Sequence, residues 1–234
     1  MNKKKESMIV TEHVLEIRHQ ASGRFLDVRG YVADHFRTNE LFPHWQIDSN
    51  IVQFRDEPKT PKKIGAFAGY KSAGLYTFDP PTRNYFEDKV GQFWKILSKN
   101  QFYTIPEIQR FGCRTKAFLN CSDSFESIND SLYQKFFSDE FRGLMGEKQK
   151  DLQIVVNLSS GKFQMNIICG PIKKNEANKY FNFKSDHFED TGIFLDIDVS
   201  MVKNIQSSKI SQLVKEAMIL TWEKIDNISK SVGI

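Results

Sequence analysis

The feature that most constrains the fold is a pair of apolar-rich runs separated by a short turn. Residues 152–158 and 162–168 flank Ser159-Ser160-Gly161, and both runs contain repeated isoleucine, valine or alternating apolar residues. Two such runs joined by a short turn that contains glycine are typical of a β-hairpin. The chain therefore contains at least one pair of antiparallel strands.

The rest of the chain predicts further hairpins and several helices. We expect strands that end at His19 and lie within 104–120 and 193–199, hairpins over 44–54 and 64–78, and helices over 25–36, 82–98 (capped by Thr82), 124–137 and 208–230. The order β-α-ββ-ββ-α-β-α-ββ-β-α does not alternate strictly, which argues against a doubly wound parallel sheet. We expect an α+β fold: a mostly antiparallel, twisted mixed sheet with helices packed on one side, or two intertwined α/β halves.

Composition supports one folded domain. Of the 234 residues, 40% are hydrophobic and 26% are charged, as in ordinary globular proteins, and the formal net charge is +4. We expect residues 1–8 to form a mobile basic N-terminus that includes Lys3–Lys5. Residues 9–234 are expected to form a single α+β domain, and 147–151 is where it would subdivide.

Location and cofactor content follow from what the sequence lacks. It has no apolar run long enough to cross a membrane and no apolar segment after the N-terminal lysines, so we expect neither a membrane span nor a secretory signal. Three cysteines (Cys113, Cys121 and Cys169) make a poor disulfide framework, which favours a cytoplasmic protein. No spacing of cysteine or histidine matches a zinc site, and no cofactor is expected.

Three segments resemble a known family. They are the aromatic-rich helix at 82–98, the RFGCR strand at 110–114, and LDIDV at 195–199 followed by the helix at 208–230. In this order they resemble an uncharacterised, sporadically distributed bacterial and archaeal family of about this size. Thr115-Lys116 stands where that family usually has a tyrosine. The resemblance implies a cytoplasmic protein, often encoded beside defence loci, and it implies no reaction.

Two charged patterns lie on the predicted strands. Arg110, Arg114 and Lys116 alternate on one face, as do Asp196 and Asp198. The basic residues are candidates for binding phosphate or an acidic partner, together with Lys59, Lys62 and Lys63 in a proline-rich turn. The two aspartates are weak candidates for a magnesium site. Alternatively, the arginines pair with these carboxylates across the sheet, which explains both patterns without any chemistry.

Aromatic residues form the other candidate surface. The chain contains 20 phenylalanines but only seven tyrosines, which favours core filling or a dry protein interface over stacking on nucleic acid. The candidate docking aromatics lie in loops 70–85 and 175–190: Tyr70, Tyr76, Phe78, Tyr180, Phe181 and Phe183. No catalytic motif is recognisable; Ser159-Ser160-Gly161-Lys162 lacks the first glycine of a phosphate loop, and His187 is interpreted as a loop histidine.

These observations leave three functional hypotheses open. The leading one is a non-enzymatic accessory or sensor subunit of a bacterial multiprotein system, such as one for anti-phage defence, that docks a larger protein encoded nearby. The second is a nucleic-acid-binding protein that uses the basic residues. The third and weakest is a magnesium-dependent hydrolase built on Asp196 and Asp198.

Overall fold

A computed structural model describes residues 9–233 of the chain, so the expectations for the Lys3–Lys5 tail lie outside the described residues. The strands are β1 (Ile9–His19), β2 (His44–Ile47), β3 (Ile51–Arg55), β4 (Ile64–Gly69), β5 (Ser72–Phe78), β6 (Ile108–Cys121), β7 (Ile154–Ser160), β8 (Phe163–Lys173) and β9 (Thr191–Met201). The α-helices are α1 (Gly23–Thr38), α2 (Tyr85–Ser98), α3 (Phe125–Phe136), α4 (Asp139–Met145), α5 (Ala177–Tyr180) and α6 (Ile210–Val232). Short 3₁₀ turns at Lys174–Glu176 and Ser207–Lys209 precede α5 and α6.

One antiparallel sheet organises the described part of the chain. Its nine strands follow the order β2-β3-β4-β5-β1-β6-β9-β8-β7, and each pair of neighbours is antiparallel. The expected α+β architecture is therefore confirmed, and no two neighbouring strands among the described residues are parallel. The three expected hairpins appear as β2-β3, β4-β5 and β7-β8. None of the described helices is long and apolar enough to cross a lipid bilayer.

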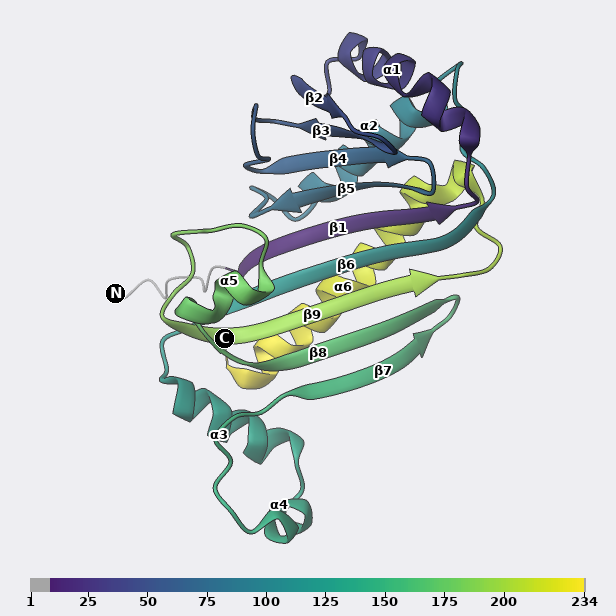
Figure 1. Ribbon diagram of the computed structural model, residues 1–234. Coiled ribbons are helices and arrows are strands. Elements are labelled where there is room, and N and C mark those ends of the chain that lie inside the picture. Colours follow the sequence, from purple (N-terminus) through teal and green to yellow (C-terminus); the bar gives the residue numbers. More distant parts are fainter. Residues whose placement is uncertain (1–8, 234) are drawn as a thin grey trace.

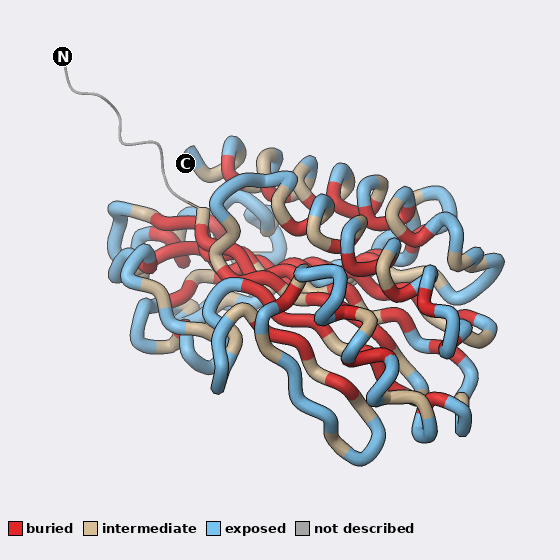
Figure 2. Tube along the Cα trace, turned by 90° about the horizontal axis from the view of Figure 1, so that it is seen from above, coloured by how far each residue is buried: buried red, intermediate tan, exposed pale blue. Residues whose placement is uncertain are grey.

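The helices divide unequally between the two faces of the sheet. Figure 1 shows α6 running diagonally across one face, with α2 beside it, whereas the short α5 lies on the opposite face. The core fills the space between the sheet and the long helices, where Figure 2 shows the buried residues concentrated. Because side chains alternate along a strand, the odd-numbered residues of β1, β6 and β9 enter this core and the even-numbered ones lie on the other face. We call that other face the open face.

Two helix boundaries differ from the expectation. Thr82 does not cap α2: the helix begins at Tyr85 after Asn84, whose side chain makes no capping hydrogen bond. Thr82 lies instead in a turn before the helix, where its carbonyl accepts a hydrogen bond from the backbone N–H of Tyr85 at 3.2 Å. The segment expected as one helix over 124–137 is followed by a second one, α4. Ser124 and Ser138 each accept a hydrogen bond from the backbone N–H three residues on, so each begins its own helix.

A close approach of two strands requires glycine at position 74. A Cβ at Gly74 would collide with the backbone carbonyl of Leu15 on β1 and with the ring of Phe67. Because backbone does not give way as a flexible side chain does, we expect Gly74→Ala to lower the free energy of unfolding by about 1–3 kcal/mol in urea denaturation. Gly91 on α2 has open space around it, so Gly91→Ala is the matched control and is expected to stabilise by about 0.5–1 kcal/mol. Equal effects of the two substitutions would contradict this packing.

Candidate functional site

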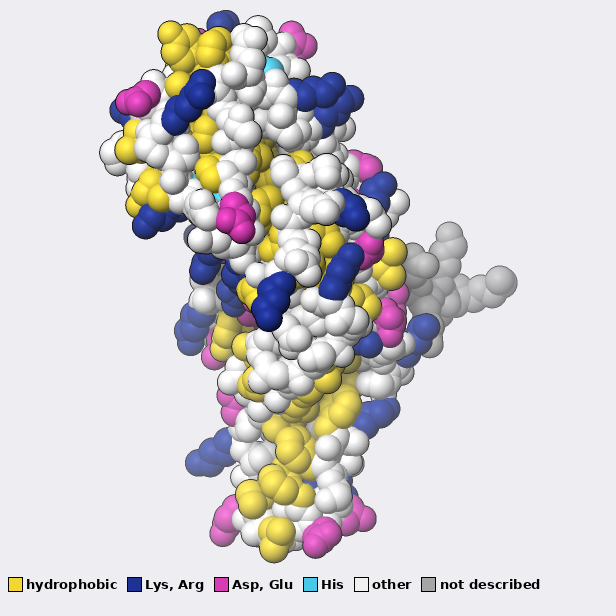
Figure 3. All heavy atoms as spheres, turned by 90° about the vertical axis from the view of Figure 1, so that its right-hand side faces the viewer, with side chains coloured by type: hydrophobic (Ala, Val, Ile, Leu, Met, Phe, Trp, Pro, Cys, Tyr) yellow, Lys and Arg dark blue, Asp and Glu magenta, His cyan; other side chains and the backbone are white. Residues whose placement is uncertain are grey.

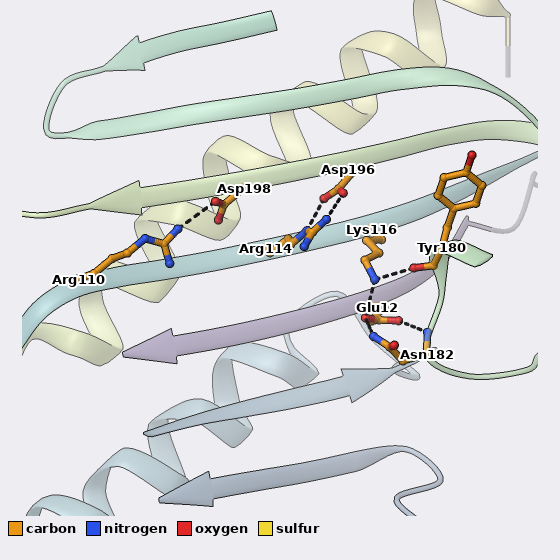
Figure 4. A network of polar contacts seen from close by, with 8 residues as sticks. All are labelled: Glu12, Arg110, Arg114, Lys116, Tyr180, Asn182, Asp196 and Asp198. Atoms are coloured by element: carbon orange, nitrogen blue, oxygen red, sulfur yellow. Dashed lines mark hydrogen bonds and ion pairs between the residues drawn. The ribbon is translucent and has the colours of Figure 1, made fainter. Parts of the chain in front are cut away.

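The basic strip predicted on β6 lies on the open face, and carboxylates pair with it. Arg110 donates to Asp198 at 3.0 Å, and Arg114 makes two hydrogen bonds to Asp196, at 2.7 and 2.5 Å. Figure 4 shows the arginines pointing toward the aspartates of the neighbouring strand. The hydrogen bond to Asp196 raises the pKa of Arg114. The interpretation of these charges as cross-strand pairs is confirmed, so they form no uncompensated basic surface.

The same ion pairs engage Asp196 and Asp198, the two weak candidates for a magnesium site. The oxygens of Asp196 and Asp198 accept from guanidinium groups rather than converging on a shared space. Within residues 9–233, no group of three histidine, cysteine, aspartate or glutamate side chains is arranged to hold a metal ion. The open-face carboxylates are thus positioned as ion-pair partners.

Lys116 belongs to a third, more deeply buried pair. Its ammonium lies 3.1 Å from Glu12 on β1 and donates to the carbonyl of Tyr180 at 2.6 Å. Glu12, 1% exposed, also accepts from the backbone N–H and the side-chain amide of Asn182, at 2.7 and 2.6 Å. These contacts, visible in Figure 4, attach the segment after α5 to the centre of the sheet. Lys116 is therefore a structural residue.

The aromatic candidates contribute mainly to a second, smaller core on the open face. This core contains Val10, Phe118, Ile172, Ala177, Phe181, Phe188 and Phe194, with Phe183 packed against it. Phe78 stacks on Phe183 with ring centroids 5.2 Å apart and is 6% exposed, and Phe181 is 4% exposed. The prediction that Phe78 and Phe181 are docking aromatics is wrong, since a ring already covered has no area left to bury against a partner.

The remaining aromatic candidates are exposed or half-buried. Tyr180 is 41% exposed and packs over Phe194. Tyr70 and Tyr76 are half-buried, and the hydroxyl of Tyr76 lies over Gly65, where a Cβ would collide with it. Tyr70 lies between β4 and β5, Tyr76 lies on β5 and Tyr180 lies on α5, and a docking role for these three rings stays a prediction.

Two predicted lysines lie instead at a cleft of about 760 Å³ where β1 begins and β5 ends. Segments far apart in sequence surround it: the 62–63 turn, the 78–83 segment, the loop at 183–187 and one residue of α6. The lining residues are Ile9, Thr11, Lys62, Lys63, Phe78, Asp79, Pro80, Pro81, Thr82, Arg83, Phe183, Lys184, Ser185, His187 and Trp222. Candidates from the basic turn and from both aromatic loops therefore meet at one concave site.

Cationic side chains dominate this cleft. Lys62, Lys63 and Lys184 form no ion pair with any described residue. The turn is held in place because the Asp56 carboxylate accepts the backbone N–H groups of Lys62 and Lys63 at 2.9 and 2.8 Å. Lys59 lies in the same turn but does not line the cleft. The lysine ammonium groups are thus available to an anionic ligand.

Arg83 also lines the cleft. Its guanidinium donates twice to Asp226, at 2.9 and 2.8 Å, and lies 4.4 Å from the centre of the Trp222 ring. The hydrogen bonds from Arg83 lower the pKa of Asp226. Since only part of its donor set is used on Asp226, Arg83 retains N–H groups for a ligand while its plane stays fixed on the indole.

A histidine–aspartate pair lies at the rim. The Nδ1 atom of His187 is 2.6 Å from the Asp79 carboxylate, which also accepts from the Ser185 hydroxyl at 3.3 Å. An ionised carboxylate only accepts, so Nδ1 carries the proton and Nε2 is the ring nitrogen left for a ligand. Asp79 has a φ of +43°, a left-handed conformation uncommon for residues other than glycine. Such strain is concentrated at functional sites.

Sequence reasoning missed this pair for a simple reason. Asp79 and His187 are 108 positions apart, and the neighbours of His187 in the sequence indicate only a loop histidine. The stacking of Phe183 on Phe78 and the hydrogen bonds of Asn182 to Glu12 bring the loop back to the sheet beside β5. An aspartate before two prolines is a turn signal and does not by itself identify a site.

The cysteines offer no reactive group. All three are free, and burial raises the pKa of Cys121 to about 11 and that of Cys169 to about 12. Burial raises the pKa of Cys113 as well. These thiols remain protonated at neutral pH and are poor nucleophiles.

Comparison with protein-family models gives no match for this chain, and comparison with curated proteins gives none either. The resemblance noted above stays a prediction, and the functional assignment rests on the geometry and chemistry of the cleft.

Proposed function

We propose that this protein binds a phosphate-bearing ligand, a nucleotide or a phosphorylated end of a single nucleic-acid strand, in the cleft between the 62–63 turn and the 183–187 loop. One observation supports this above all: three lysines without carboxylate partners among the described residues converge with Arg83 and His187 on one concave site. Phosphate oxygens accept charge-assisted hydrogen bonds from such donors. The proposal keeps the nucleic-acid hypothesis but moves it from the β6 strip to the cleft.

The apolar part of the cleft suits the remainder of such a ligand. Phe183 is half-buried, and Pro80 and Pro81 line the same cleft. A nucleobase stacks on an aromatic face whatever its identity, which contributes about 1–3 kcal/mol per base. In this arrangement Lys62, Lys63 and Lys184 hold phosphate, Arg83 adds directional donors, and Phe183 holds the base.

The lysine pair gives the direct test. Replacing Lys62 and Lys63 together with alanine is expected to weaken binding of a 5′-phosphorylated single-stranded hexanucleotide by between about 10- and 100-fold, since about 1.4 kcal/mol per lysine–phosphate interaction is a factor of ten. The slope of log affinity against log salt is expected to fall by about 0.7 for each phosphate group that the variant no longer neutralises. Fluorescence anisotropy at several salt concentrations measures both.

The control and the ligand series make the result specific. Lys59→Ala removes a lysine from the same turn but outside the cleft, and is expected to change affinity less than twofold. A nucleoside monophosphate that binds as tightly as the hexanucleotide identifies a free nucleotide as the ligand. Tighter, steeply salt-dependent binding of the hexanucleotide identifies a strand. Absence of binding by every phosphate probe would refute the proposal, as would a loss caused only by Arg110→Ala with Arg114→Ala.

A second candidate function, docking of a larger protein partner, is favoured by apolar side chains at the β2 end of the sheet. Trp45 and Ile47 on β2 are 42% and 38% exposed, and Tyr31, 56% exposed, stacks on Phe102. A partner with aliphatic side chains would cover this end. Co-purification of neighbouring gene products that survives nuclease treatment and is lost in Trp45→Ala would support it, and a phage-challenge assay would test the proposed defence role.

A further inference from the structure

The strand at the other end of the sheet, β7, is an edge strand without the usual protection. Its sequence, Ile-Val-Val-Asn-Leu-Ser-Ser, contains no proline and no charged residue, and its five central residues are exposed. Val155, Val156 and Leu158 are 56%, 39% and 38% exposed. Exposed edge strands in soluble proteins usually have a charge, a proline or a covering segment, because their free backbone groups otherwise pair with another chain.

The register with β8 shows which backbone groups are free. Ser160 pairs with Phe163 across the two-residue turn of the hairpin, so these two residues exchange backbone hydrogen bonds. Because hydrogen-bonded and non-hydrogen-bonded pairs alternate along an antiparallel ladder, the N–H and C=O groups of Val155, Asn157 and Ser159 point away from β8. The edge therefore presents three residues with both backbone groups available.

These three residues are self-complementary about Asn157. In an antiparallel pair of two β7 strands centred on this residue, Asn157 lies opposite Asn157 of the other copy, and Val155 lies opposite Ser159. All the free backbone groups of the strand are then satisfied with the correct alternation. On the face toward the helices, Val156 meets Leu158, which brings apolar side chains together and no like charges.

We propose that β7 pairs with β7 of a second copy of this chain around a two-fold axis at Asn157, so that one sheet continues through both copies. On a two-fold axis a surface meets itself, so it must contain no repelling charge. The strand satisfies this condition. The nearest lysine of the hairpin, Lys162, is already paired with Glu216 at 2.6 Å.

The surface around β7 supplies additional apolar area. A stable interface buries about 800 Å² on each partner, more than one strand pair provides. Figure 3 shows hydrophobic side chains gathered in a band down the lower part of the molecule, where Figure 1 places β7, α3 and α4. The exposed large hydrophobic residues of α3 and α4 are Phe136, Phe141, Leu144 and Met145.

Light scattering coupled to size-exclusion chromatography tests the pairing. Between about 10 and 100 µM we expect the wild-type chain to reach about twice the monomer mass of 27.2 kDa. Asn157→Lys places two lysines opposite each other at the two-fold axis, where like charges repel, and Asn157→Pro removes a free N–H at a position that proline tolerates on an edge. Both variants are expected to be monomers with the circular dichroism of the wild type.

Val202→Lys is the matched control, because Val202 is 61% exposed and lies after β9, a strand that β8 separates from β7. It is expected to remain a dimer. Amide exchange at Val155, Asn157 and Ser159 is expected to slow as protein concentration rises. A wild-type monomer over the whole range would overturn the proposal, as would a dimer that both β7 variants retain. Loss of a different partner protein, rather than of the second copy, in these variants would also overturn it. Phosphate-ligand binding is measured separately and is expected to be unchanged in all three variants.

Discussion

Glu12→Ala is expected to lower the free energy of unfolding by about 3–5 kcal/mol, the cost typical of removing one partner from a buried ion pair. The carboxylate lies at the centre of the sheet and accepts hydrogen bonds from Lys116 and from two N–H groups of Asn182. Without it, Lys116, whose side chain is only 13% exposed, keeps a charge without its carboxylate partner. Urea denaturation followed by circular dichroism measures the change.

The same substitution is expected to affect the cleft. Asn182 precedes Phe183 and Lys184, and its bonds to Glu12 fix the start of the loop that also contains His187. Loss of this attachment is expected to weaken ligand binding even where the protein is still folded. Glu16→Ala is the control on the same strand: its carboxylate is 32% exposed and pairs at the surface, so a change below about 1 kcal/mol is expected. Equal destabilisation by both substitutions would contradict this account of Glu12.

Acid is expected to destabilise the protein strongly through His13. This residue is fully buried, where its ring nitrogens contact the hydroxyls of Thr11 and Thr115 at 3.0 and 2.9 Å. Desolvation lowers its pKa from 6.5 to about 3. Between these two values the unfolded chain binds a proton that the native protein does not, so stability falls as the pH decreases. The slope is about 1.4 kcal/mol per pH unit, which amounts to about 4–5 kcal/mol by pH 3.

The variant His13→Gln isolates this effect. Burial also lowers the pKa of His19, so His19 too makes the protein less stable in acid. This contribution is the same in the wild type and in the variant, and it cancels in their difference. We expect the stability difference between wild type and variant to shrink by about 2.3 kcal/mol between pH 6.5 and pH 4.5, as measured by urea unfolding at each pH. A difference that is constant over this interval would show that His13 is protonated in the native state.

Local signals in the sequence predict much of this fold. The hairpins are predictable because their turns contain glycine or polar residues between alternating apolar runs, and the helix that begins at Ser124 is predictable from its apolar face. The order of strands was not predictable in the same way. Nothing adjacent in sequence indicates that β1 inserts between β5 and β6, since that placement depends on pairing between distant segments.

The candidate site shows the same contrast between features that local sequence predicts and features that depend on contacts between distant segments. Lys62 and Lys63 were recognised because a basic proline-rich turn must be exposed, and the pairing of Arg114 with Asp196 was foreseen because alternating charges on two strands match across a sheet. Two docking aromatics, Phe78 and Phe181, were misjudged. Sequence alone does not show that the 174–190 segment folds back over the open face and covers them.

The most direct test of the proposed function locates the ligand on the protein. Titration of ¹⁵N-labelled protein with a 5′-phosphorylated dinucleotide is expected to shift amide resonances of residues 62–63, 79–84, 183–187 and 222, which surround the cleft. Amides of 110–116 on the open face are expected to stay in place, because their side chains are engaged with carboxylates. Shifts confined to 110–116, or no shift at millimolar ligand, would contradict a phosphate-binding cleft.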